Sequence, residues 1–126
     1  MTDLDLAVDV FVVARPDRVA AAVHEASRWP GWWPDLTLAV LEDRGQDGLR
    51  WSVAGAVLGS AELWLEPVLD GVVVHWFLRG RLDGGSAGRE RARRTQSWLR
   101  AALALKDELE AGRPAGVKPR PDDADE

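Results

Sequence analysis

The residues of this chain that could take part in chemistry are few, and they are spread over separate predicted elements. The 126 residues include no cysteine, no tyrosine and only two histidines, His24 and His75. Neither histidine has the spacing of a metal-ligand motif, so we predict no metal site and no cofactor. The lack of cysteine also excludes a thiolate nucleophile and a disulfide framework. The sequence therefore predicts no catalytic residue.

Two acidic side chains, Glu62 and Glu66, share one face of a predicted strand, as a paired-carboxylate hydrolase would require. The simpler interpretation is that Arg79 and His75, on the next strand, neutralise them across the sheet. We therefore predict that His75 and Glu66 form a surface pair and not a general base.

Two cations lie on the apolar side of a predicted helix, Lys106 near its end and Arg91 near its start. The stem of Lys106 could cover apolar surface while its ammonium group reaches water. Alternatively, the ammonium group could bind a ligand carboxylate or enolate at the end of a cavity. Burial would require a partner, because an unpaired buried charge costs several kcal/mol. The same two interpretations apply to Arg91, and the sequence leaves both open.

The element that carries these cations is one long helix, predicted from Ser86 to Ala111. Ser86 is a suitable N-cap, and Gly112 followed by Pro114 is a suitable stop. A helical period places one apolar arc toward the rest of the protein. The arc contains Ala92, Thr95, Trp98, Leu99, Ala102, Leu103, Leu105 and Leu109.

The segments before this helix are predicted to be mostly strands. Residues 4–13 alternate between apolar and polar side chains, as in a half-buried strand. Pro16 then suits the first turn of a short helix, whose apolar positions recur through Ala26. Further strands are predicted at residues 37–43, 49–54, 60–68 and 72–81. The order of the elements predicts an α+β fold built on an antiparallel sheet.

The last two strands are predicted to form a hairpin around a two-residue Asp70–Gly71 loop. This loop would pair Leu69 with Val72 and would fix the register of both strands. On one face the register pairs Glu66 with His75, Trp64 with Phe77, and Glu62 with Arg79. On the other face it pairs Leu65 with Trp76 and Leu63 with Leu78. We expect the second face to point toward the long helix.

Tryptophan is the unusual residue type, with seven copies against two phenylalanines and no tyrosine. Three of them lie in the segment RWPGWWPDL, residues 28–36, where two prolines and a glycine exclude a long helix. The rings of this segment either fold back onto the core or cover the mouth of a pocket. So many large rings in a small domain indicate a bulky core or a cavity lined with rings.

Length and composition indicate one domain over residues 1–112, followed by a disordered tail over residues 113–126 that is rich in proline, glycine and charge. The net charge of −5 argues against nucleic acid as the main partner. No apolar run approaches the roughly 20 residues of a membrane span, so no stable membrane insertion is expected. The start lacks the pattern of a signal peptide, and we expect the protein in the cytoplasm.

The order of these elements resembles the START/Bet v1-like superfamily, and more narrowly its bacterial polyketide cyclase/dehydrase-type members. The likeness spans residues 4–112 and rests on the helix at 16–27, the RWPGWWPDL segment, GLRW at 48–51, AELWLEP at 61–67 and ALKDELE at 104–110. It implies a helix-grip fold, in which a curved antiparallel sheet of five to seven strands wraps the C-terminal helix around an apolar cavity. The superfamily commonly has seven strands, whereas five are found here.

The resemblance implies binding of a small hydrophobic ligand, such as a lipid or polyketide and perhaps an aromatic one. The residues expected at the ligand are Trp32, Trp33, Trp51, Trp76, Trp98 and Leu99, with Lys106 and Arg91 as polar anchors. An aromatase/cyclase acting on a polyketide is the alternative, although no proton-transfer group is evident. A third hypothesis is a homodimeric interaction module that uses Trp64 and Phe77 on the outer face of the sheet.

Overall fold

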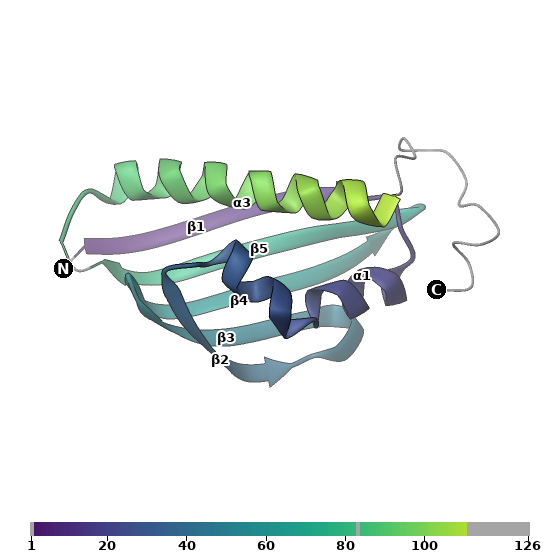
Figure 1. Cartoon of the computed structure of the whole chain (residues 1–126), viewed down its shortest axis with the longest axis horizontal. Helices are drawn as coiled ribbons and strands as arrows, with labels where there is room; N and C mark the ends of the chain where they lie inside the picture. Colours follow the sequence, from purple (N-terminus) through teal and green to yellow (C-terminus); the bar gives the residue numbers. More distant parts are fainter. Residues whose placement is uncertain (1, 83, 111–126) are drawn as a thin grey trace.

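The computed structural model describes residues 2–82 and 84–110, and it shows one antiparallel sheet with helices on one of its faces (Figure 1). The strands are β1 (Thr2–Val12), β2 (Leu36–Asp43), β3 (Gly48–Gly55), β4 (Val57–Val68) and β5 (Gly71–Leu82). Their order in the sheet is β1-β5-β4-β3-β2, so the first strand lies beside the last. The helices are α1 (Pro16–Val23), α2 (Trp29–Trp32) and α3 (Ala87–Glu110), with 3₁₀ turns η1 (Ala26–Arg28) and η2 (Gly45–Asp47).

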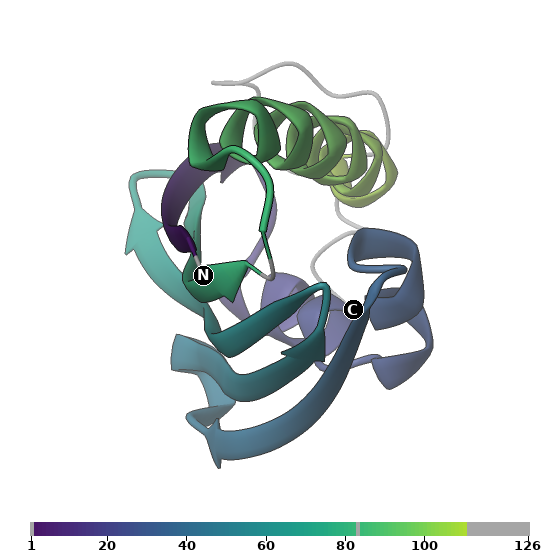
Figure 2. The ribbon, with the colours of Figure 1, turned by 90° about the vertical axis from the view of Figure 1, so that its left-hand side faces the viewer.

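The sheet curves around an interior that the helices close. Helix α3 runs along β1, and α2 contacts α3. Figure 2 shows the sheet turning away from α3 toward β2, while α1 and α2 cover the remaining open side. These features confirm the predicted α+β fold: five curved antiparallel strands, a short helix after the first strand and a long last helix.

The alternation of β1 is confirmed, because Leu4, Leu6 and Val8 are buried while the intervening Asp5 is exposed. Helix α1 begins at Pro16, as predicted, but it ends at Val23. The predicted continuation to Ala26 is wrong. Glu25 adopts an extended backbone with φ −73° and ψ 99°, which ends the α-helical hydrogen bonds and starts η1.

The predicted hairpin exists, but its register is wrong by two residues. The loop is Leu69–Asp70, closed by the pair Val68 and Gly71, and Leu69 takes the left-handed conformation with φ 53°. Gly71 belongs to β5 because it lies against β1, where a Cβ would stand 2.2 Å from the Val12 carbonyl oxygen. A slip of two residues keeps each side chain on its predicted face. The observed pairs are therefore Trp64 with His75, Glu62 with Phe77, Ser60 with Arg79, Leu65 with Val74 and Leu63 with Trp76.

Helix α3 begins as predicted, since the Ser86 hydroxyl accepts a hydrogen bond from the Arg89 backbone N–H at 3.3 Å. The rotation of the helix differs from the prediction. Leu99 and Leu103 are 36% and 50% exposed, whereas the charged residues Arg94 and Glu110 are buried beside the apolar ones. The physical reason is that both buried charges are paired. Arg94 pairs with Asp35 on another segment. Glu110 pairs with Lys106 one turn earlier in α3 and accepts a hydrogen bond from the Val13 backbone N–H. The predicted stop at Gly112 and the predicted tail over 113–126 lie outside the described residues.

Candidate ligand-binding site

A cluster of five tryptophans fills the space between the sheet and α3, and we call it the tryptophan cluster. It consists of Trp32, Trp33, Trp51, Trp76 and Trp98, and each of these side chains is at most 8% exposed. Trp33 lies at its centre. Ring-centroid distances from Trp33 are 5.2 Å to Trp51, 5.7 Å to Trp76 and 6.0 Å to Trp98, and the last pair is stacked with planes inclined by 6°. The structure thus brings together all five tryptophans that the sequence analysis singled out.

The members of the cluster differ in how firmly the backbone holds them. Trp51, Trp76 and Trp98 come from β3, β5 and α3, which are regular elements. Trp32 ends the four-residue helix α2, and Trp33 follows it with φ −135° and ψ 71°. The rings of the segment at residues 28–36 therefore fold back onto the core, which is the first of the two arrangements that the sequence allows.

Four indole N–H groups of the cluster are buried and have no hydrogen-bond acceptor among the described residues. They are the Nε1 groups of Trp33, Trp51, Trp76 and Trp98. By contrast, Nε1 of the neighbouring Trp29 donates to the Val23 carbonyl oxygen at 2.9 Å. Buried indole N–H groups usually have a partner, and each one without a partner requires an explanation. Their concentration around one ring marks the interior as a candidate site.

A network of charged groups lies at one edge of the cluster. Arg94 Nη2 donates to Asp35 Oδ2 at 2.6 Å, and Arg94 Nε donates to Glu90 Oε1 at 2.8 Å. The Arg94 side chain is only 5% exposed, and the adjacent Arg93 also pairs with both acids. Every charge of the network therefore has an opposite charge beside it.

The network shifts the pKa values of its acids. Burial alone would raise the pKa of Asp35, but hydrogen bonds and charge from Arg94, with Arg93, outweigh it and hold the pKa below its ordinary value of 3.8. The hydrogen bond from Arg93 lowers the pKa of Glu90 below its ordinary value of 4.5. Both carboxylates are therefore ionised at neutral pH.

Lys106 lies toward the other end of α3, with its side chain 25% exposed. Its Nζ donates to the Phe11 carbonyl oxygen at 2.8 Å and to Glu110 Oε2 at 2.5 Å. Glu110 Oε2 also accepts a hydrogen bond from the Val13 backbone N–H at 2.8 Å. The ammonium group is thus held by groups of the protein. Arg91 and Leu99, the other two predicted contacts, are exposed on α3, and the structure does not bring them into the tryptophan cluster.

Two small hollows flank the segment that carries Trp33. One of about 30 Å³ lies between this segment and α3, and its lining includes Trp33, Trp76, Arg93 and Arg94. The other, of about 210 Å³, lies on the side of β2 and is lined by Trp29, Pro30, Trp33, Pro34, Leu36, Leu38 and Ala26. A volume of 30 Å³ holds no more than about one water molecule. In this conformation the tryptophan rings themselves occupy the interior.

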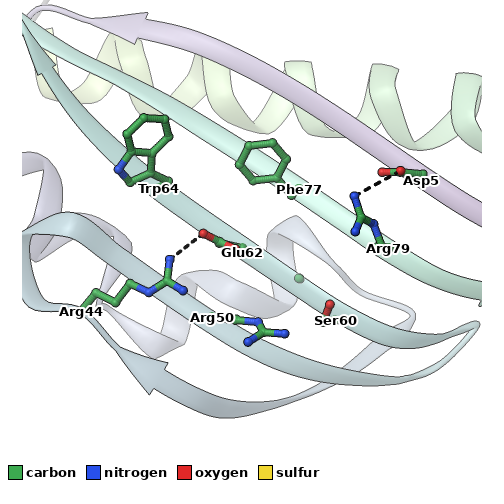
Figure 3. Close-up of a pocket in the computed structure, with 9 residues that line it drawn as sticks. Asp5, Arg44, Arg50, Ser60, Glu62, Trp64, Phe77 and Arg79 are labelled. Carbon is green, nitrogen blue, oxygen red and sulfur yellow. Dashed lines mark hydrogen bonds and ion pairs between the residues drawn. The ribbon is translucent and has the colours of Figure 1, made fainter.

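A wider hollow of about 460 Å³ lies on the opposite, outer face of the sheet (Figure 3). Trp64 and Phe77 stand on neighbouring strands there, and Trp64 stacks on His75 with a centroid distance of 4.6 Å. The predicted contact between Glu62 and Arg79 is wrong because of the register. Glu62 instead pairs with Arg44 at 2.6 Å, and Arg79 pairs with Asp5 at 3.3 Å.

Both histidines have partners in the structure. His75 Nε2 lies 2.9 Å from Glu66 Oε1, which confirms the predicted pair as a diagonal contact across the hairpin. His24 contacts the Ala20 carbonyl oxygen at 2.7 Å and Asp43 Oδ1 at 2.9 Å. Neither histidine lines either of the hollows beside Trp33.

No family model matches the sequence, and a search of curated proteins by sequence finds no match. Solved structures do resemble the fold. The Aha1 dimer from Colwellia psychrerythraea aligns with a TM-score of 0.66 at 18% identity, over 88% of this chain and 99% of that one. DynU16, from the dynemicin biosynthetic locus, aligns with a TM-score of 0.64 at 23% identity over 87% of this chain and 48% of its own.

The di-domain ARO/CYC StfQ from the steffimycin biosynthetic pathway aligns with a TM-score of 0.56 at 16% identity, over 87% of this chain and 53% of StfQ. The chain thus spans about half the length of StfQ and of DynU16. The shared arrangement, a curved antiparallel sheet against a long C-terminal helix, is the helix-grip fold that the sequence predicts. All three identities are below 25%, so they show a shared fold and carry no activity with them.

In this helix-grip domain the space between the sheet and α3 holds the tryptophan cluster, as described above. Its sheet has five strands over the described residues, the number that the sequence predicts. No helix within residues 2–82 and 84–110 is both long enough and apolar enough to cross a lipid bilayer.

Proposed function

We propose that the chain binds a small hydrophobic ligand between the sheet and α3, in the space that the tryptophan cluster fills. The observation that carries the proposal is the set of four buried indole N–H groups without acceptors. A binding pocket is typically apolar with a few polar groups that fix orientation, and these donors would supply that function. The preferred ligand is a polyketide-like or lipid-like molecule with oxygen acceptors, and an aromatic one suits the rings best.

The names of the similar structures support this class of ligand. DynU16 and StfQ both come from biosynthetic loci or pathways, and StfQ is named as an ARO/CYC protein. For this chain we propose the cluster tryptophans as the lining. Lys106, Arg91 and Leu99 remain proposed contacts for a ligand that moves α3, because they lie at the margin or on the outside of that helix.

Native mass spectrometry of the freshly purified protein, followed by extraction under denaturing conditions, tests the proposal. We expect a discrete small-molecule adduct. Trp76→Phe, which keeps a ring but removes one N–H donor, should retain less of it. Trp64→Phe is the matched control on the outer face and should retain as much as the wild type. A clean mass without adduct, and no stabilisation by polyketide, lipid or quinone analogues, would overturn the proposal.

A cyclase acting on a polyketide is a second candidate, supported by the likeness to StfQ. Such an enzyme would hold the chain bent near its reactive geometry and would stabilise an enolate with a cation. Lys106 is the proposed cation, and it would have to leave Phe11 and Glu110 to act. A Lys106→Met variant with full activity on a demonstrated substrate would exclude this role.

A homodimer through the outer face is a third candidate. Trp64 and Phe77 are 40% and 37% exposed there, and a similar structure is described as a dimer. Sedimentation at high concentration should then give a dimer that Trp64→Ser weakens. A monomer at every concentration would overturn this candidate.

A further inference from the structure

Two residues of one short segment occupy positions that a ligand could take. Trp33 places its indole at the centre of the tryptophan cluster, and Asp35 places its carboxylate on Arg94. Only Pro34 separates them in the sequence. Together they present an aromatic ring and, beside it, an anionic group.

The ion pairs that join the segment from Arg28 to Asp35 to α3 lie at its two ends. At one end Arg28 Nη2 pairs with Glu108 Oε2 at 2.6 Å, and at the other end Asp35 pairs with Arg94. Between them, α2 has only four residues and contains Pro30, and a second proline precedes Asp35. No residue before Leu36 in this segment belongs to a strand. Movement of the segment would break the ion pairs at its ends and the hydrogen bond from the Ala56 backbone N–H to the Asp35 carbonyl oxygen. It would leave the strand pairing of the sheet, which begins at Leu36, intact.

Movement of Trp33 would leave a pocket with a defined lining. Trp51, Trp76 and Trp98 would remain, because strands and α3 hold them, and each has an indole N–H without an acceptor. The guanidinium group of Arg94 borders the same 30 Å³ hollow as Trp33 and Trp76. Without Asp35, this buried cation would lose its bidentate partner, and such a loss is costly. An anionic ligand would restore the pair.

We propose that the ligand is a planar aromatic molecule with one anionic group, whose ring replaces the indole of Trp33 and whose anionic group replaces the carboxylate of Asp35 on Arg94. A carboxylate and an ionised phenol share this chemistry. The inference rests on the proposed function and adds the ligand's charge, its orientation and the segment that moves. Asp35 is thus an internal competitor of the ligand.

A pair of fluorescent probes with one ring system tests the proposal. The anionic probe is 1-anilinonaphthalene-8-sulfonate, and the neutral one is N-phenyl-1-naphthylamine. Titrations give both dissociation constants for the wild type and for Asp35→Asn, and competition between the probes shows that they share a site. Because Asp35→Asn weakens the internal competitor, we expect it to lower the dissociation constant of the anionic probe about tenfold, which corresponds to about 1.4 kcal/mol. The dissociation constant of the neutral probe should change little.

Asp43→Asn is the matched control, since it makes the same change in charge at an exposed carboxylate on β2. It should leave both dissociation constants near their wild-type values. Arg94→Met should reduce the affinity for the anionic probe to that for the neutral one. Arg100→Met makes the same charge change at an exposed position of α3 and should leave both affinities near their wild-type values. Circular dichroism checks that each variant folds. If Arg94→Met fails to fold, the comparison of Asp35→Asn with Asp43→Asn still decides.

Each outcome separates this inference from the proposed function. Failure of both probes to bind any variant, including Trp33→Ala, would overturn the proposed function and this inference with it. Binding of both probes with equal effects of Asp35→Asn and Asp43→Asn would overturn only the inference. Equal tightening of both probes by Asp35→Asn would also overturn it, because Asp35 would then only hold the segment closed. Selective tightening of the anionic probe would support it.

Discussion

The carboxylate of Glu110 accepts a hydrogen bond from the backbone N–H of Val13 at 2.8 Å, across a separation of 97 residues. The same oxygen lies 2.5 Å from the ammonium group of Lys106, which in turn donates to the Phe11 carbonyl oxygen. One buried carboxylate thus joins the end of α3 to the end of β1. It adds a polar attachment near the C-terminal end of α3 to the ion pairs that Arg94 and Glu108 of this helix make with Asp35 and Arg28.

Glu110→Ala is expected to lower the free energy of unfolding by about 2 kcal/mol, because it leaves the buried Val13 N–H and the Lys106 ammonium group without this acceptor. Asp107→Ala, an exposed change on the same turn, should alter it by less than about 0.5 kcal/mol. Urea denaturation of both variants measures the difference. Equal stability of the two would contradict a role for Glu110 in attaching the helix.

The face of α3 shows what sequence periodicity can and cannot predict. The helix, its start at Ser86 and the burial of Trp98 and Leu105 follow from the 3.6-residue period. The burial of Arg94 and Glu110 does not, because a charged residue is placed on the exposed side unless its partner is known. The partners outside α3, Asp35 and the Val13 backbone N–H, lie 59 and 97 residues away in the sequence, and the spacing of residues within the helix indicates neither. The periodicity therefore predicts Leu99 on the inward side and gives no indication that Arg94 is buried.

Arg94→Met should lower the free energy of unfolding by about 2 to 3 kcal/mol, because Asp35 and Glu90 lose their shared buried partner. The cost is kept to this size because Asp35 is 38% exposed and can be hydrated. Arg91→Met, at an exposed position three residues earlier, should change the value by less than about 0.5 kcal/mol. Thermal and urea unfolding of the two variants measure this contrast.

The β4–β5 loop gives a third prediction. Leu69 is 97% exposed and adopts φ 53°, a conformation that costs a residue with a Cβ about 1 kcal/mol. Leu69→Gly should therefore raise the free energy of unfolding by roughly 0.5 kcal/mol, after allowance for the greater freedom of glycine in the unfolded chain. Leu58→Gly, at another exposed leucine, should instead be destabilising because it lies within β4.

The same loop explains why the sequence placed the register wrongly. An Asp-Gly pair between two apolar runs is the usual sign of a two-residue loop, so the sequence predicts Gly71 in the loop. In the structure Gly71 serves a tertiary purpose, since β1 approaches it too closely for a side chain. The faces of the strands were still predicted, because a shift of two residues does not exchange them.

Gly71→Ala should therefore destabilise the protein by about 2 kcal/mol or more, because the new Cβ would stand 2.2 Å from the Val12 carbonyl oxygen. Gly31→Ala is the matched control, since a Cβ at that position in α2 has nothing within 4 Å. The measurement is again the midpoint of unfolding. A Gly71→Ala variant as stable as Gly31→Ala would favour the register with Asp70–Gly71 in the loop.

The stability of the fold should fall in acid through the ion pairs that hold the segment before β2. Burial alone would raise the pKa of Asp35, but Arg94 and Arg93 outweigh it and hold this pKa below 3.8. Hydrogen bonds from Arg93 to Glu90 and from Arg28 to Glu108 lower the pKa values of these two acids below 4.5. Between the unfolded and folded pKa values the unfolded chain binds more protons, so acid favours unfolding. The stability that these ion pairs contribute is complete above about pH 5.5. It decreases as the pH falls through the ordinary pKa values of the acids and is lost below their pKa values in the folded protein. The free energy of unfolding of Asp35→Asn should therefore depend less steeply on pH between pH 5 and pH 3 than that of Asp107→Asn. Equal pH dependence of the two variants would show that the Asp35–Arg94 pair does not stabilise the folded state.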